Sequence, residues 1–244
     1  MTRRLLPALA ALALAGLALA GCATGDVEES APPAGDPAGQ TMPEGSGDVE
    51  VDAAWLAGGS MIAVITYGSS TPGCQPTLDG SVLDDGVLVV SLVPAEESVC
   101  DGDLVPRGIL VETPSGIDPA DGLAVQVSVS DTFAEATLAP YAGGEAEDYA
   151  PSAGWAGDDR IAILTWGSSS CAPAVEKTTV VSPTEVAVTF ATPRADQVCT
   201  MDMAPRVAVA TVTGEVSRDA TLSLGGITTG SPGDDAPGAA IPIG

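Results

Sequence analysis

Two stretches of nearly identical sequence decide the fold: MIAVITYGSS at residues 61–70 and RIAILTWGSS at residues 160–169, 99 positions further on. A tryptophan precedes each stretch, Trp55 in the first case and Trp155 in the second. Short apolar runs that are rich in Val, Ile and Thr and stop at a glycine are typical of β-strands. Two such runs with the same surroundings indicate an internal duplication.

The cysteines repeat with the same spacing. Cys100 and Cys199 are also 99 positions apart, and each is preceded by Val and followed by an Asp and a Pro-Arg pair. Cys74 and Cys171 are 97 positions apart, so the loop before this cysteine is two residues shorter in the second copy. Many identities at one offset make chance a poor explanation, and we interpret the chain as two copies of one unit.

Within each copy the apolar segments are short and alternating, and turn residues separate them every 8–15 positions. This pattern predicts antiparallel β structure. We expect strands at residues 61–67, 76–83, 87–93, 107–112 and 123–129 in the first copy and at residues 160–166, 176–181, 185–191, 206–213 and 221–224 in the second. The residues 84–86, Asp-Asp-Gly, predict a hairpin turn, and residues 131–138 are the best candidate for a short helix.

The expected fold class is all-β. Five strands per copy can close a small antiparallel β-sandwich or a barrel-like unit with a thin core. Alternatively, both copies share one core as a ten-strand sandwich. Gly, Pro and acidic residues at 141–154 look like a linker, which favours two tandem domains.

The chain begins like an exported protein. Two arginines, Arg3 and Arg4, precede an apolar segment at residues 5–19, and small residues end it, which are the marks of a secretory signal. Leu-Ala-Gly at residues 19–21, directly before Cys22, resembles the lipobox of bacterial lipoproteins. That resemblance implies lipid on Cys22, attachment to the cell membrane and an extracytoplasmic location. A retained transmembrane helix is the alternative, and prolines and glycines in the segment weaken it.

The other four cysteines allow three pairings. Because each copy carries one pair at matching positions, we predict the disulfides Cys74–Cys100 and Cys171–Cys199, which suit an exported chain. Each would close a loop that the chain-entropy model values at roughly 3–4 kcal/mol. Metal or redox chemistry is the alternative use, but the sequence has no C-x-x-C spacing and no histidine.

Composition excludes several functions. The chain has a net charge of −25, and from Cys22 onward it has 6 basic and 33 acidic residues, for a net −27. Such a surface repels nucleic acid, so we expect no nucleic-acid partner. Without histidine there is no Ser-His-Asp site and no usual zinc site. No stretch matches a calcium loop, so we predict no metal, no cofactor and no catalytic residue.

One charged pair occurs in both copies at the same spacing: Asp103 with Arg107, and Asp202 with Arg206. We interpret each as an ion pair that holds the loop after the second cysteine against the next strand. Contact with a ligand is the alternative. The Gly-Ser-Ser segments before the first cysteines are interpreted as polar turns rather than as nucleophiles, because the sequence offers only carboxylates as bases.

The aromatic residues also recur at matching places. We interpret them as buried anchors of the β core, with an exposed binding face as the alternative. They are Trp55, Tyr67, Trp155 and Trp166.

Changes in composition divide the chain. Residues 26–49, before the first copy, lack apolar periodicity and are rich in Gly, Pro and acidic residues. We predict a signal peptide at 1–21, a disordered tether at 22–50, the first β unit at 51–140, a linker at 141–153, the second β unit at 154–227 and a disordered tail at 228–244.

A lipobox followed by Trp-Gly-Ser-Ser-Ser-Cys and Cys-x-x-Asp-x-x-Pro-Arg units resembles uncharacterised secreted lipoproteins of high-GC Gram-positive (actinobacterial-type) bacteria. The resemblance covers residues 55–224, and the first copy departs from it with Tyr67 in place of the tryptophan and with a longer approach to Cys74. It implies export and anchoring, and it supplies no site.

We therefore expect a cell-envelope lipoprotein that is not an enzyme and that has a binding or structural role at the outer face of the membrane. Its partners are the membrane, through lipid on Cys22, and an unidentified protein or envelope component. One alternative is a hydrolase that uses two carboxylates. Another is an accessory or signalling protein that recognises a protein partner by strand addition at a sheet edge.

Overall fold

A computed structural model describes residues 50–244, except residues 72, 96–98, 142 and 227–239. In the described residues the regular structure is β-strand, with two short 3-10 turns, η1 (Ala57–Gly59) and η2 (Pro119–Asp121). The all-β prediction is confirmed. The predicted signal peptide, most of the predicted tether and Cys22 lie outside the described residues.

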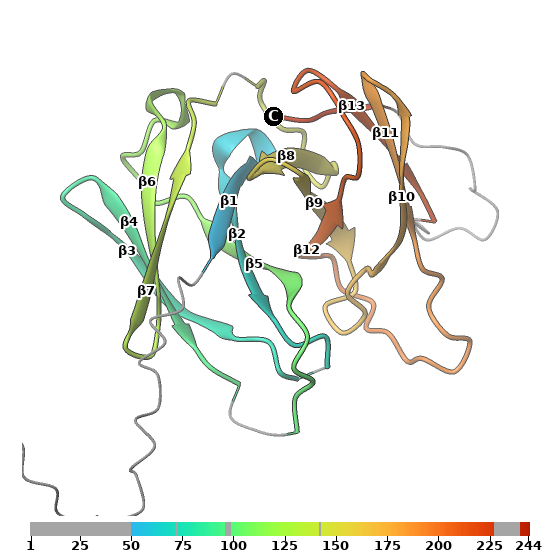
Figure 1. The fold of residues 1–244 in the computed structure, drawn as a ribbon, viewed down its shortest axis with the longest axis horizontal. Helices are drawn as coiled ribbons and strands as arrows, with labels where there is room; N and C mark the ends of the chain where they lie inside the picture. The colour runs from blue at the N-terminus through green and yellow to red at the C-terminus, as the bar shows by residue number, and fades with distance from the viewer. Residues whose placement is uncertain (1–49, 72, 96–98, 142, 227–239) are drawn as a thin grey trace, which may run out of the picture. The chain divides into compact units, whose positions relative to one another are not determined.

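The first domain consists of two sheets (Figure 1). One has three strands in the order β1-β2-β5, and the other has four in the order β3-β4-β6-β7. The strands are β1 (Val51–Leu56), β2 (Met61–Gly68), β3 (Thr77–Asp84), β4 (Val87–Val93), β5 (Val105–Glu112), β6 (Leu123–Val129) and β7 (Thr132–Leu138).

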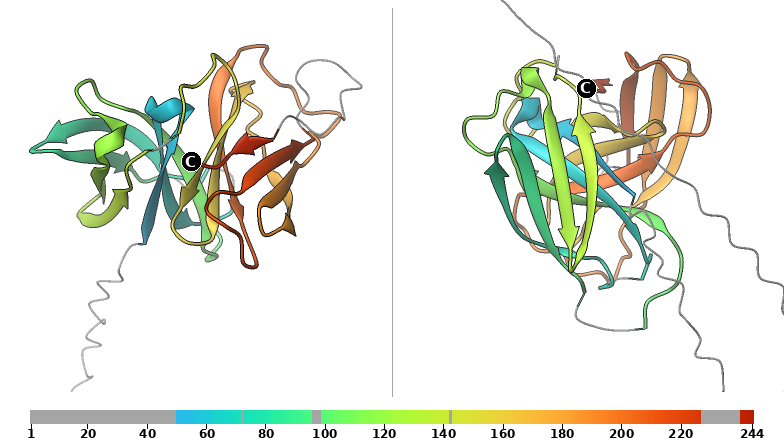
Figure 2. Two further views of the ribbon diagram at one scale, coloured as in Figure 1. Left: turned by 90° about the horizontal axis from the view of Figure 1, so that it is seen from above. Right: turned by 60° about the vertical axis from the view of Figure 1, so that its left-hand side comes forward.

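The second domain has the same arrangement. Its three-stranded sheet has the order β12-β9-β8, and its four-stranded sheet has the order β10-β11-β13-β14. The strands are β8 (Ser152–Ala156), β9 (Arg160–Gly167), β10 (Val175–Ser182), β11 (Glu185–Phe190), β12 (Ala204–Thr211), β13 (Thr221–Gly225) and β14 (Ile241–Pro242). The chain is therefore two tandem β domains, as predicted, and Figure 2 shows their sheets from two further sides.

All ten predicted strands are present, with shifts of no more than two residues at their ends. The predicted hairpin turn joins β3 to β4, and its residues Asp85 and Gly86 both have positive φ, 45° and 84°. Positive φ at both central residues defines a type I′ turn, whose twist matches that of the flanking strands.

Several finer expectations were wrong. Residues 131–138 were expected to be a short helix, but Thr132–Leu138 is strand β7, because its alternate residues Ala134 and Leu138 are buried against the core. The sheets are also mixed: β4 pairs with β6 in parallel, as β11 does with β13. The connection between the parallel strands runs through the other sheet, so no hairpin joins them.

The predicted bounds of the second domain also change. Strand β8 begins at Ser152, inside the predicted linker, and β14 (Ile241–Pro242) lies inside the predicted disordered tail. Strand β14 pairs with β13 as β7 pairs with β6. The end of the chain, which Ile243 fixes by a bridge to Ala153, is thus part of this domain.

Each domain has its own core, and a third core joins them. Alternate residues of β2, Ile62 and Val64, face the four-stranded sheet of their own domain. The intervening Ala63 and Ile65 pack against Leu164 and its neighbours in the other domain. Strands β2 and β9 are therefore buried on both faces, which explains why their sequences are continuous apolar runs rather than alternating ones.

Two glycines permit the close approach of the domains. A Cβ atom on Gly154 of β8 would lie 2.3 Å from the backbone oxygen of Trp55 in β1, and one on Gly108 of β5 would lie 2.8 Å from Val207 in β12. A larger residue at either position would have to push the two three-stranded sheets apart.

Candidate functional site: two disulfide-linked loop pairs

A disulfide joins two loops at one end of each domain. In the first domain the Cys74–Cys100 bridge links the loop after β2 to the loop before β5, with a Cα–Cα distance of 5.9 Å. In the second domain Cys171–Cys199 links the equivalent loops, with a Cα–Cα distance of 5.5 Å. Both predicted pairings are confirmed. The loops before β5 and before β12 lie at the same, lower end in Figure 1.

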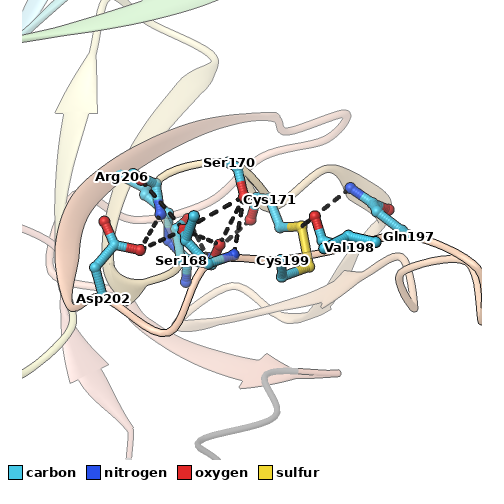
Figure 3. Close-up of a disulfide and its surroundings, with 10 residues drawn as sticks. Ser168, Ser170, Cys171, Gln197, Val198, Cys199, Asp202 and Arg206 are labelled. Carbon is cyan, nitrogen blue, oxygen red and sulfur yellow. Dashed lines mark hydrogen bonds between the residues drawn. A yellow bond between two sulfur atoms is a disulfide. The ribbon is translucent and has the colours of Figure 1, made fainter.

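In the second domain, Arg206 and Asp202 fix the loop that follows β9 (Figure 3). The Arg206 guanidinium, at the start of β12, donates to the carbonyl oxygens of Cys171 at 2.8 Å and Trp166 at 3.1 Å. The Asp202 carboxylate accepts a hydrogen bond from the backbone N–H of Ser169 at 3.0 Å. The two side chains thus hold opposite backbone groups of one turn.

The first domain repeats this arrangement of one carboxylate and one guanidinium bound to the same turn, which we call the clamp. Arg107 donates through Nε and Nη2 to the carbonyl oxygen of Ser69, at 3.1 and 2.7 Å. Asp103 accepts from the backbone N–H of Ser70 at 2.9 Å. The prediction that these charged residues hold the loop in place therefore fits the contacts, but the loop that they hold is the one after β2.

The charges of each predicted pair act on each other only at a distance longer than a salt bridge. In the described part of the chain, the salt bridges lie at Arg160, Arg194 and Arg218, and neither Asp103–Arg107 nor Asp202–Arg206 forms one. The physical reason is competition: in each pair the acid binds a backbone N–H and the base binds backbone carbonyls, so both charges are already engaged with the same turn.

These bonds shift the pKa values of the charged groups. Hydrogen bonds from Thr200 and Ser169 hold the pKa of Asp202 well below its usual range, and hydrogen bonds from Ser70 lower the pKa of Asp103. Burial lowers the pKa of Arg206. Both carboxylates are therefore charged at any ordinary pH, and neither has the raised pKa of a general acid.

The serine hydroxyls bond within the same loops. The hydroxyl of Ser168 lies 2.8 Å from that of Thr200, and Thr200 in turn donates to Asp202. The hydroxyl of Ser170 accepts from the Thr200 N–H at 3.0 Å. This network connects the two loops on either side of the disulfide, in keeping with the interpretation of the serines as parts of a polar turn.

Large apolar side chains project from the loops before β5 and β12. In the first domain Val99 is 94 % exposed and Leu104 is 78 % exposed. Their equivalents 99 positions on, Val198 and Met203, are 90 % and 59 % exposed, and Met201 beside them is fully exposed. We call these five residues the loop tips. Sequence reasoning missed them, although an apolar residue at matching places in two polar loops was the available signal.

Two hollows lie beside the loops. A cavity of about 570 Å³ adjoins the second disulfide and is lined by Trp166, Phe190 and Met201, among others. A groove of about 660 Å³ runs between the domains, where Gln75 beside the first disulfide and Ala172 beside the second both line it. The two loop pairs are therefore neighbours across this groove.

Of the recurring aromatic residues, Trp166 lines the cavity that Met201 and Met203 also line. Trp55 is buried, as predicted, and donates to the Ala139 carbonyl at 2.9 Å. Tyr67, Trp155 and Trp166 are only partly buried, which corrects the prediction for them.

Tyr67 lies between the domains. Its hydroxyl donates to Asp52 at 2.5 Å, and the Arg160 guanidinium lies 4.7 Å from its ring centre. Burial and the Asp52 carboxylate raise the pKa of Tyr67. Tyr67 thus contributes to the junction of the domains rather than to an exposed aromatic face.

Within the described ranges, no group of three or more acidic or cysteine side chains is placed to hold a metal ion. The same part of the chain contains no helix with the length and apolar character of a membrane span. Comparison with protein-family models, with curated proteins and with solved structures found no match.

Proposed function

We propose that this protein is a cell-envelope lipoprotein, anchored through lipid on Cys22, that binds a protein partner with the loop tips of both domains and catalyses no reaction. The lipobox supports the anchor, and the loop tips support the binding role. Single exposed apolar residues are ordinary on protein surfaces. Here, however, Val99 and Leu104 recur as Val198 and Met203 on equivalent, stapled loops, and this recurrence is the observation that carries the proposal.

The construction of the loops supports binding. A disulfide and a charged clamp hold each loop pair, so little conformational entropy is lost when a partner binds. Arg206 and Asp202 bind the backbone of the loops themselves. The apolar side chains of the tips are therefore available to a partner, and protein contacts commonly use exposed apolar surface.

The pairing of the domains supports a two-point contact. The third core, around Ile65 and Leu164, packs the two domains against each other, and we propose that one partner reaches both sets of loop tips. A partner that touches both sets binds the second in an intramolecular step, which raises the total affinity above that of either domain alone.

Photo-cross-linking in intact cells tests the binding surface. Leu104 or Met203 is replaced by benzoylphenylalanine, and the matched control carries the same replacement at Val181, which is exposed on β10 away from the loops. We expect one discrete adduct, of the same mass, from both loop positions and none from the control. Equal adducts from all three positions, or none from the loop positions, would contradict the proposal.

Mass spectrometry of the mature N-terminus tests the anchor. We expect the chain to begin at Cys22 with acyl groups attached, and we expect Cys22→Ala to release the protein from the membrane fraction. Two or more acyl chains are enough for stable attachment, since each buried CH₂ contributes about 0.8 kcal/mol. A retained Met1, or an unmodified thiol at Cys22, would show that the protein is not a lipoprotein.

A further inference from the structure

We infer that the free edge of β12 is a second binding site, which accepts an extended polypeptide segment as an additional strand. The inference deepens the proposed function and rests on it for its partner, since the segment would belong to the protein that the loop tips bind. Strand β12 is the outer strand of its sheet and pairs with β9 on one side. Its other side faces the groove between the domains.

The hydrogen bonds show which backbone groups of β12 face the groove. The N–H of Val212, directly after the strand, donates to Asp159 at 2.7 Å and so points toward β9. In an antiparallel pair, alternate residues direct their N–H and C=O groups to the same side. Because the register of β12 is uninterrupted, the groups of Val207, Val209 and Thr211 point away from β9. All three residues line the groove.

The two domains differ at one backbone group of this edge. In β5, the carbonyl oxygen of Gly108 accepts a hydrogen bond from the side chain of Gln75 at 3.1 Å. The equivalents of these residues are Val207 and Ala172, and an alanine has no donor to offer. Sheet edges with unpaired backbone groups can pair with another strand, and the carbonyl that Gln75 occupies in the first domain has no such side-chain cap in the second.

The groove has a wall from each domain beside the β12 edge. Its volume of about 660 Å³ is within the range of roughly 300–1,000 Å³ that is usual for ligand sites. Strand β5 contributes residues 105–108 to the lining, and β10 contributes residues 175–178. Pro205, which has no N–H, limits the open edge to the stretch that begins at Val207.

Charge narrows the chemistry of the segment. Lys177 and Arg107 line the groove against a single acid, Glu176, in a chain whose net charge is −25. Among the described residues, Lys177 takes part in no salt bridge. The segment that fits is therefore extended, free of proline where it pairs, and carries one acidic side chain that can reach Lys177.

The experiment uses linear nine-residue peptides selected from a displayed random library against the folded mature protein. Without peptide, we expect the amide protons of Val207, Val209 and Thr211 to exchange faster than those of Ala208 and Ala210. With peptide, we expect those three to become protected in hydrogen-exchange NMR. Protection elsewhere only, or the selection of no peptide, would overturn the inference.

A designed variant checks the mechanism. Ala172→Gln gives the second domain the cap that Gln75 gives the first, and it should weaken peptide binding about tenfold, the effect of one competing hydrogen bond. The control Thr179→Gln adds the same side chain to an exposed position of β10 outside the groove. Equal affinities of the two variants would overturn the inference.

The two proposals fail separately. Loss of cross-linking at the loop tips with peptide binding at β12 intact would contradict the proposed function alone. Normal cross-linking at Leu104 and Met203 without protection of the β12 edge would contradict this inference alone.

Discussion

At the scale of single residues, each loop pair depends on one carboxylate and one guanidinium that bind the backbone of the same turn. The sequence identifies four residues as candidates for this role, because the same spacing occurs in both copies: Asp103, Arg107, Asp202 and Arg206. It does not predict their partners: Asp103 and Arg107 contact residues 33 and 38 positions away, and only the fold brings Ser70 and Ser69 to them. Local spacing suggested a direct ion pair for that reason.

The lowered pKa of Asp202 gives a pH dependence with a defined sign. The folded state favours the charged form, so the unfolded chain takes up the proton at a higher pH than the folded chain does. The stabilisation is complete above the ordinary carboxyl pKa of about 4 and is lost as the pH falls below it. Asp202→Asn should therefore be less stable than the wild type at pH 7 and approach it near pH 2 to 3.

Urea unfolding at both pH values measures this difference, and comparison with the wild type removes the effect of the many other acids. Asp131→Asn, in the turn between β6 and β7, serves as the control for the loss of one charge. A deficit of Asp202→Asn that is the same at both pH values would show that the hydrogen-bonded carboxylate does not stabilise the loop.

Arg206 tests the other half of the clamp. A lysine can place its ammonium near one carbonyl, but it lacks the planar fork that reaches Cys171 and Trp166 together. We expect Arg206→Lys to cost about 1–3 kcal/mol of unfolding free energy. Arg194→Lys, at an exposed pair with Asp196, should cost less than about 1 kcal/mol. Equal losses in thermal unfolding would contradict the clamp.

At the scale of elements, strands with an alternating pattern or a long apolar run, such as β4 and β2, were predicted, whereas β1, β7, β8 and β14 were not. Strand β1 contains Ala-Ala-Trp-Leu and is buried on both faces, so its sequence shows no alternation. Strand β7 has helix-forming Ala and Glu, but packing against the core overrides that weak preference. The parallel pairs escaped prediction because their strands are joined through the other sheet, which no local pattern reveals.

The close contact between β1 and β8 depends on Gly154, which has no side chain. In Gly154→Ala the new Cβ would lie 2.3 Å from the Trp55 backbone oxygen, and neither strand can move without disturbing a core. We expect a loss of about 1–3 kcal/mol in unfolding free energy. Gly80→Ala, on β3 with no atom within 4 Å of the added Cβ, is the control and should change little. Denaturant unfolding that ranks the two variants equally would rule out this close contact.

At the scale of the whole molecule, the third core joins the domains into one folding unit. The sequence left open whether the copies form separate domains or share a core, and the structure combines both arrangements, with one core in each domain and one between them. We therefore expect a single calorimetric unfolding transition. Leu164→Ala, fully buried in the third core, should cost about 2–5 kcal/mol and lower the melting temperature of both domains together.

Two separate transitions in the wild type would contradict that coupling. So would a loss confined to the second domain, which is the result expected of domains that fold independently. Leu222→Ala, equally buried in the core of the second domain, provides the comparison for a change of the same volume.

The central claim is that the loop tips of both domains form one binding surface. Its most direct test measures how much partner is retained on intact cells by three variants: Val99→Ser with Leu104→Ser, Val198→Ser with Met203→Ser, and all four changes together. We predict that either pair of changes reduces retention and that the fourfold variant abolishes it, at unchanged melting temperature. Full retention by the fourfold variant would contradict the account.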